Sequence, residues 1–136
     1  MKSYTLYLEK DNDQVEVELR LDIEGVLALK KKYNEMTVET IYGAIEDPEK
    51  MVFIFDKCLN FPGNKNVIKN GKDLYNLLVD NGKGGMEGFW EVISGIAKES
   101  GILSERMSER MNKNATEMFD RMFSEDSQGN PETPQP

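Results

Sequence analysis

Residues 4–19 read YTLYLEKDNDQVEVEL, and the expected fold class follows from this stretch. Apolar and polar side chains alternate before and after a central Lys-Asp-Asn-Asp, with Leu6 and Leu8 on one side of it and Val15 and Val17 on the other. Alternation with a period of two is typical of strands with one buried face, and a short polar link between them is typical of a β-hairpin. Because an isolated hairpin is marginal in water, its Leu/Val face needs cover from the segments that follow.

Helical spacing replaces the alternation after Asp22 and predicts five helices before residue 102. The first is expected over 23–33 behind an Asp22 N-cap, with Ile23, Val26, Leu27 and 30–33 on its inner stripe. A second follows Thr37 with Val38, Ile41, Tyr42 and Ile45, and a third begins at Asp47-Pro48 and carries Met51, Val52, Phe55 and Leu59. After a loop over 61–71 with at most a short turn at Val67 and Ile68, a fourth begins near Asp73 with Leu74, Leu77 and Leu78. Residues 81–85 are expected to be a flexible joint before a fifth helix with Phe89, Trp90, Ile93, Ile96 and Ala97.

The C-terminal part predicts a methionine-rich helix and then a loss of order. Leu103, Met107, Met111, Ala115, Met118 and Met122 recur at helical spacing, with Phe119 and Phe123 beside the stripe. Residues 124–136 are acidic, rich in Pro and without a large apolar side chain. The sequence therefore predicts a mainly α, α+β fold: an N-terminal hairpin packed on about five to six helices, and a disordered acidic tail. Residues 1–123 would form one domain, with 103–123 as a separate Met-rich helix left as an alternative.

Composition favours a protein that works inside the cell without nucleic acid or membrane as a partner. The chain carries 17 Lys and Arg against 25 Asp and Glu, and a formal charge of -8 repels both phosphate backbones and anionic lipid. Its single cysteine, Cys58, cannot form an internal disulfide, and residues 1–8 lack the pattern of a secretion signal. No apolar run approaches the roughly 20 residues that span a bilayer. We therefore expect a reducing cytoplasm.

The chain lacks the residues that most enzymes use. It contains no histidine, which excludes Ser-His and Cys-His nucleophiles and His-bearing zinc sites. The carboxylates are spread over the polar faces of the predicted elements, and Cys58 lies among apolar neighbours, which favours a buried thiol over a reactive one. We therefore expect no catalytic residues, no cofactor and no metal.

The methionine stripe is the main candidate for a binding surface. Thioether side chains are flexible and polarisable, so a Met-lined face adapts to different partners, although such a stripe also suits a core. The candidate partner-binding residues are Met107, Met111, Met118, Phe119 and Met122, with Phe89 and Trp90 as further candidates.

Three segments carry a resemblance to a known family. KDLYNLLVD at 72–80, FWEVI at 89–93 and AKESGIL at 97–103 follow a predicted hairpin and helices. In this order the chain, over about residues 4–103, resembles tail assembly chaperones of long-tailed phages and prophages of Gram-positive bacteria. The resemblance implies a non-catalytic protein that is made in the cytoplasm of a bacterial host, coats the tape measure protein, recruits tail tube subunits and is absent from the finished virion. It also implies several copies along the client, and an oligomer is a further expectation. The Met-rich segment 107–122 matches no pattern of that family.

Two other functions remain as alternatives. A structural virion component, such as a tail-completion or head-tail connector protein, would also be small and acidic. An acidic inhibitor that mimics DNA would need dense rows of carboxylates on one surface. Lysines intersperse the acids instead, at Lys30, Lys31, Lys32, Lys57, Lys65, Lys69 and Lys72.

Overall fold

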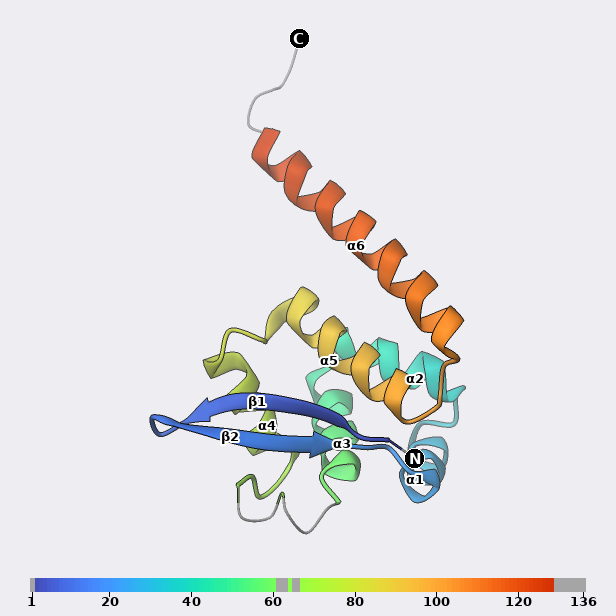
Figure 1. Cartoon of the computed structure of the whole chain (residues 1–136). Helices are drawn as coiled ribbons and strands as arrows, with labels where there is room; N and C mark the ends of the chain where they lie inside the picture. The colour runs from blue at the N-terminus through green and yellow to red at the C-terminus, as the bar shows by residue number, and fades with distance from the viewer. Residues whose placement is uncertain (1, 61–63, 65–66, 129–136) are drawn as a thin grey trace. The chain divides into compact units, whose positions relative to one another are not determined.

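The computed structural model describes residues 2–60, 64 and 67–128, and for 123–128 it describes the backbone alone. Contacts within the chain divide it into two compact units, Met1–Ser104 and Glu105–Pro136. The first unit contains a β-hairpin and five α-helices, and the second contains one long helix (Figure 1). The predicted mainly α, α+β fold, with an N-terminal hairpin followed by helices, is confirmed.

The hairpin consists of β1 (Tyr4–Lys10) and β2 (Asp13–Leu19), paired antiparallel. Leu6 lies opposite Val17 and Leu8 opposite Val15, as the alternation predicts. The turn residues Asp11 and Asn12 have φ of 53° and 70°. Two consecutive left-handed residues form the type I′ turn, whose twist suits a hairpin and which Asp and Asn tolerate better than most residues.

Five α-helices and one 3-10 helix follow in the first unit. They are α1 (Ile23–Tyr33), α2 (Thr37–Gly43), the 3-10 helix η1 (Ala44–Glu46), α3 (Pro48–Cys58), α4 (Gly71–Asp80) and α5 (Gly85–Glu99). Asp22 caps α1 by accepting a hydrogen bond from the Gly25 amide at 2.9 Å, and Asp47 caps α3 by accepting one from the Lys50 amide at 3.3 Å. Both predicted N-caps are confirmed.

Helix α4 begins before the predicted Asp73. Its N-cap is Asn70, whose side-chain oxygen accepts a hydrogen bond from the Asp73 amide at 2.9 Å. Gly71 starts the helix because a Cβ there would collide with the Val52 carbonyl oxygen of α3. Residues 61–63 and 65–66 of the preceding predicted loop lie outside the described residues.

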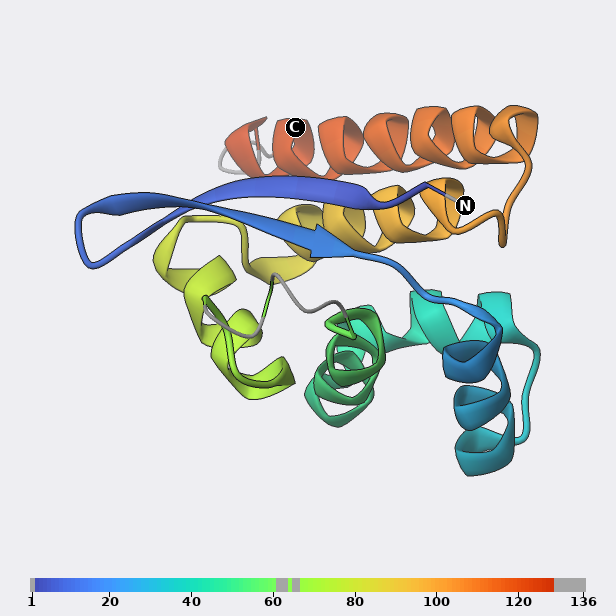
Figure 2. The ribbon, with the colours of Figure 1, turned by 60° about the horizontal axis from the view of Figure 1, so that its bottom comes forward.

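The core of the first unit joins the inner face of the hairpin to all five helices. Its largest fully buried side chains include Leu8, Leu19, Leu29, Ile41, Met51, Ile54, Phe55, Leu74, Leu78, Ile93 and Ile96. Helices α3, α4 and α5 each contact the hairpin and lie on one side of it (Figure 2). The ring of Tyr4 lies over Gly95 of α5, where a Cβ would collide with it.

Two asparagine side chains close parts of the outer edges of the hairpin. The Asn81 amide accepts from the Glu9 N–H at 2.8 Å and donates to the Glu9 carbonyl at 3.1 Å. Asn64 makes the same pair of bonds with Glu18, at 3.1 and 2.6 Å. Each amide thus imitates one residue of a further strand and satisfies edge groups that would otherwise invite pairing. Residues 81–85 were expected to be a flexible joint, and this expectation is wrong for Asn81, which is fixed to β1.

The inner stripe predicted for α1 is also partly wrong. Ile23 and Leu27 are 63% and 58% exposed, whereas Gly25 and Leu29 are buried. A Cβ at Gly25 would collide with the buried side chain of Leu21, so the absence of a side chain lets this position of α1 face inward. A glycine in the middle of the buried face makes the apolar pattern point to the wrong side of the helix.

The second unit is α6 (Glu105–Gln128). It begins two residues later than the predicted 103–123 helix, and Leu103 is buried in the first unit. It extends past residue 123 because no Gly or Pro occurs before Gly129. Residues 124–128 of the predicted tail continue the backbone of α6, and the rest of the tail, 129–136, lies outside the described residues.

Candidate functional site

The methionines predicted to bind a partner share one side of α6. At about 100° per residue, Met107, Met111, Met118 and Met122 fall within an arc of about 60°. Met107, Met118 and Met122 are 44%, 39% and 40% exposed. We call these four residues the methionine face. Phe119 lies on the same helix but outside the arc of these four methionines, and unlike them it is buried.

The opposite side of α6 is charged. Arg106, Glu109, Lys113 and Asp120 project roughly opposite the methionine face at helical spacing. The helix is therefore amphipathic, with two positive and two negative charges among these four residues.

Phe89 and Trp90 lie on α5, in the first unit. Phe89 is only 4% exposed, and its ring packs 4.9 Å from that of Tyr75 and 6.5 Å from that of Phe55, centre to centre. Trp90 is half-buried, with its ring 4.8 Å from that of Tyr42. The burial of Phe89 argues against direct contact with a partner and assigns it to the core.

Cys58 is fully buried at the end of α3. Burial raises the pKa of its thiol far above the ordinary value, and the nearby Asp22 carboxylate raises it further. Because the thiolate is the reactive form, the predicted structural role of this cysteine agrees with its surroundings.

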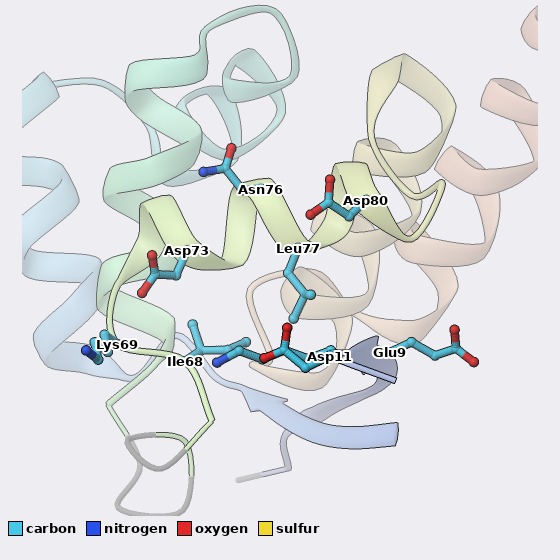
Figure 3. A pocket seen from close by; sticks show the side chains of 9 residues that line it. Glu9, Asp11, Ile68, Lys69, Asp73, Asn76, Leu77 and Asp80 are labelled. Atoms are coloured by element: carbon cyan, nitrogen blue, oxygen red, sulfur yellow. The ribbon is translucent and has the colours of Figure 1, made fainter. Parts of the chain in front are cut away.

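A groove of about 580 Å³ lies between the hairpin turn and α4 (Figure 3). Its lining residues are Glu9, Lys10, Asp11, Ile68, Lys69, Asp73, Asn76, Leu77 and Asp80. The Lys10 ammonium is already engaged, donating to the Val67 carbonyl at 2.5 Å. Within the described parts of the chain, no three Asp, Glu, Cys or His side chains come close enough to hold a metal ion. The groove thus offers scattered charges without an organised reactive set.

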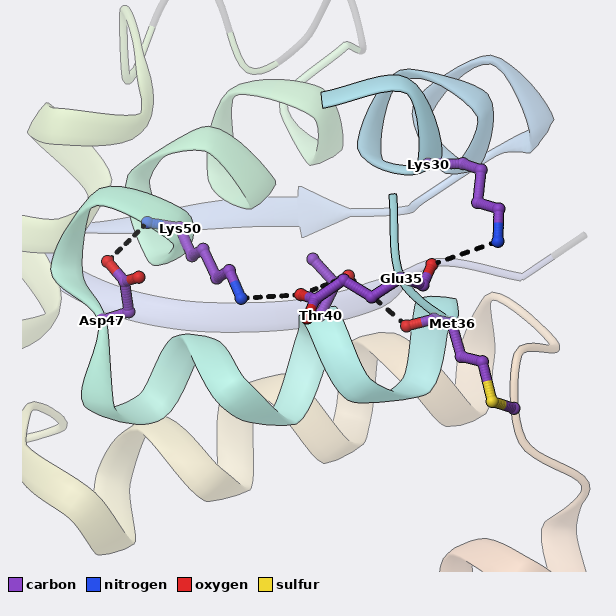
Figure 4. A network of polar contacts seen from close by, with 6 residues as sticks. All are labelled: Lys30, Glu35, Met36, Thr40, Asp47 and Lys50. Carbon is purple, nitrogen blue, oxygen red and sulfur yellow. Dashed lines mark hydrogen bonds and ion pairs between the residues drawn. The ribbon is translucent and has the colours of Figure 1, made fainter. Parts of the chain in front are cut away.

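The most connected polar network joins the α1–α2 link to α3 (Figure 4). The Glu35 carboxylate accepts from the Lys50 ammonium at 2.6 Å and from the Thr40 hydroxyl at 3.0 Å. The hydrogen bond from Lys50, followed by that from Thr40, holds the pKa of Glu35 below its ordinary value. The same pairing raises the pKa of Lys50. Both hydrogen bonds end on Oε1 of Glu35, and together they link the α1–α2 connection to α2 and α3, which makes the network a structural tie.

Sequence reasoning missed an exposed apolar set in the first unit. Ile23, Leu27 and Met36 are 63%, 58% and 64% exposed, at or near α1. In the sequence, the only signal for Ile23 and Leu27 was the glycine at position 25, because a glycine on the buried side of α1 turns these two residues toward solvent.

No helix within residues 2–60, 64 and 67–128 is long and apolar enough to cross a membrane. Comparison with known proteins found no matching family model, no matching curated protein and no matching solved structure. The exposed surfaces of the molecule, chiefly the methionine face of α6, are therefore the basis for inferring its function.

Proposed function

We propose that this chain is a non-catalytic assembly chaperone that binds an apolar helical segment of a client protein with the methionine face of α6. The resemblance carried by residues 72–80, 89–93 and 97–103 suggests the client. It is the tape measure protein of a long-tailed phage or prophage, around which tail tube subunits are recruited in the host cell.

The observation that carries the proposal is the exposure of Met107, Met118 and Met122 on one side of one helix. Contiguous exposed apolar side chains mark contact surfaces, and anchors repeated at helical spacing suit a helix laid against an apolar partner. Methionine can repack around segments of different sequence, as a long client requires.

The charge of the chain suits the same role. A formal charge of -8 gives a complex with an apolar client a shell that resists aggregation. The balanced charges opposite the methionine face keep that side of α6 hydrated while the client occupies the methionine face.

The test replaces Met107, Met111, Met118 and Met122 with Gln and co-expresses the variant with the tape measure protein of the same genome. Gln and Met have similar helix propensity, so α6 should persist while its apolar surface is lost. Removing even one or two hot-spot side chains weakens binding by about tenfold or more, so recovery of the client on the tagged chain should fall at least that far.

A matched control changes the opposite side of the same helix. Arg106, Glu109, Lys113 and Asp120 replaced with Gln alter the same number of residues and leave the net charge unchanged. Client recovery should stay at the wild-type level. Equal recovery with the methionine variant, or equal loss with the control, contradicts the proposal.

A second measurement separates a chaperone from a permanent virion component. Mass spectrometry of purified particles should detect tail tube and tape measure proteins without this chain. Its presence in particles in stoichiometric amounts would favour the structural alternative.

A further inference from the structure

A basic, aromatic surface lies where α1 packs against α3. The Lys32 ammonium is 4.7 Å and the Lys57 ammonium 5.2 Å from the centre of the Phe53 ring. The Tyr33 ring meets the Phe53 ring edge-on, with centres 5.8 Å apart. We call Lys32, Tyr33, Phe53 and Lys57 the lysine-aromatic surface.

The two lysines of this surface carry charge that the described part of the chain does not neutralise. Neither Lys32 nor Lys57 has a carboxylate within 4 Å among the described residues, whereas Lys50 nearby is paired with Glu35 at 2.6 Å. Lys30 and Lys31 add further positive charge in the same last turn of α1. The carboxylates of Glu35, Asp47 and Glu49 lie close enough to Tyr33 to add to the effect of burial in raising its pKa, so the positive charge is concentrated around the four lysines and does not extend over the whole surface.

Stabilisation of helix ends explains part of this arrangement. Lys30, Lys31 and Lys32 occupy the last turn of α1 and Lys57 that of α3, where cations interact favourably with the helix dipole. The dipole does not account for the convergence of two lysines from different helices on one half-buried ring. Cations held against aromatic rings form a surface with both charge and apolar area.

The outer face of the hairpin has the complementary character. The alternation that buries Leu6, Leu8 and Val17 turns Thr5, Tyr7, Glu9, Gln14, Glu16 and Glu18 outward. Tyr7 is 60% exposed and lies opposite Glu16 in the register. Three carboxylates and one exposed ring thus share a face on which neither strand places a cation.

We propose that the lysine-aromatic surface of one chain docks on the outer hairpin face of a second copy. Lys32 and Lys57 would meet Glu16 and Glu18, and the Phe53 and Tyr33 rings would lie against Tyr7. The second copy is the occupant because it supplies both the opposite charge and an exposed ring.

Each chain carries one surface of each kind, so each copy can bind one neighbour through each surface, and the contact then repeats head-to-tail from copy to copy. This self-association uses only the first unit and does not depend on the methionine face. It would place several copies in a row, as an extended client requires.

Sedimentation velocity of the full chain over a range of concentrations tests the proposal. The wild type should show reversible, concentration-dependent association. Reversing the charge of one surface with Lys32→Glu and Lys57→Glu, or of the other with Glu16→Lys and Glu18→Lys, should weaken it by about tenfold or more, because like charges then face each other across the contact.

Mixing supplies the decisive comparison. An equimolar mixture of the two reversed variants restores opposite charges at every contact, and so does a single chain with all four substitutions, which keeps the formal charge of -8. Both should regain association. Lys69→Glu with Lys72→Glu changes the net charge as Lys32→Glu with Lys57→Glu does, at exposed positions away from the surface, and should leave most of the association intact.

Three results would overturn the proposal: a wild type that stays monomeric at all concentrations, an equal loss with the Lys69 and Lys72 control, or no recovery on mixing. Circular dichroism confirms that each variant is folded. Because client recovery is measured on α6 variants, failure here is distinguishable from failure of the chaperone proposal.

Discussion

Gly95 determines how closely the hairpin can approach α5. In most helices Gly→Ala stabilises by about 1 kcal/mol, because Ala loses less backbone freedom on folding. Here a Cβ would collide with the Tyr4 ring, and overpacking of this kind costs about 1–3 kcal/mol. We expect Gly95→Ala to lower the free energy of unfolding, measured by urea titration.

The control removes the obstacle. In a Tyr4→Val background, where the ring is absent and strand propensity is kept, Gly95→Ala should be neutral or stabilising. A stabilising effect of Gly95→Ala with Tyr4 in place would contradict the contact between that ring and α5.

For single residues, the N-caps of helices could be predicted from the sequence, but contacts between residues far apart in the sequence could not. Asp22 and Asp47 were identifiable as N-caps because the capping bond is local in sequence. Asn81 was not identifiable as a hairpin clamp, because its partner Glu9 lies 72 positions away.

Among the elements, the α1–α2 link and α3 are joined by the Glu35–Lys50 pair, which makes part of the stability depend on pH. A carboxyl group whose pKa is lowered on folding contributes stability above its unfolded pKa and loses it as the pH falls through the folded value. The ordinary pKa of such a group is 4.5, and the hydrogen bonds from Lys50 and Thr40 place that of Glu35 lower. We expect Glu35→Gln to be less stable than the wild type at pH 7 and the difference to shrink at about pH 3.

Urea unfolding of both proteins at the two pH values measures this effect. Glu39→Gln is a matched control, since Glu39 is an exposed carboxylate on α2 without an ion pair among the described residues. It should show no comparable pH-dependent difference. A Glu35→Gln deficit that persists unchanged in acid would mean that its carboxylate charge is not the cause.

The ends of helices could be predicted from the sequence where a helix breaker or an N-cap residue was present. The buried side of a helix was predicted wrongly where the size of a side chain mattered more than its polarity. Helix α1 was predicted with its observed limits because the Asp22 cap is unambiguous. The alternation predicted the hairpin, but Lys10 and Asp13, expected in the polar link, are paired within the strands. The inward side of α1 was predicted wrongly because Gly25 and Leu29, not Ile23 and Leu27, are the buried residues. Close packing against the Leu21 side chain requires a small residue at position 25, and a hydrophobicity pattern does not register this.

For the molecule as a whole, the fold class was predictable, and the candidate binding surfaces only in part. The methionine face followed from helical spacing alone, since it lies within one helix. The lysine-aromatic surface did not, because Lys32 and Phe53 come from different helices and only their packing brings them together.

The division into two units predicts that the first unit folds without α6. The core cluster of the hairpin and α1–α5, with the side chains packed against it, contains no residue beyond Ile102. A chain ended after Ser104 should therefore keep one cooperative unfolding transition, with a midpoint within about 5 °C of the full chain, a shift that corresponds to about 1 kcal/mol.

By the chaperone proposal, the chain ended after Ser104 should also lose the client, which binds α6. Calorimetry and co-purification measure the two effects separately, and a truncated chain that retains the client would place the binding surface in the first unit instead.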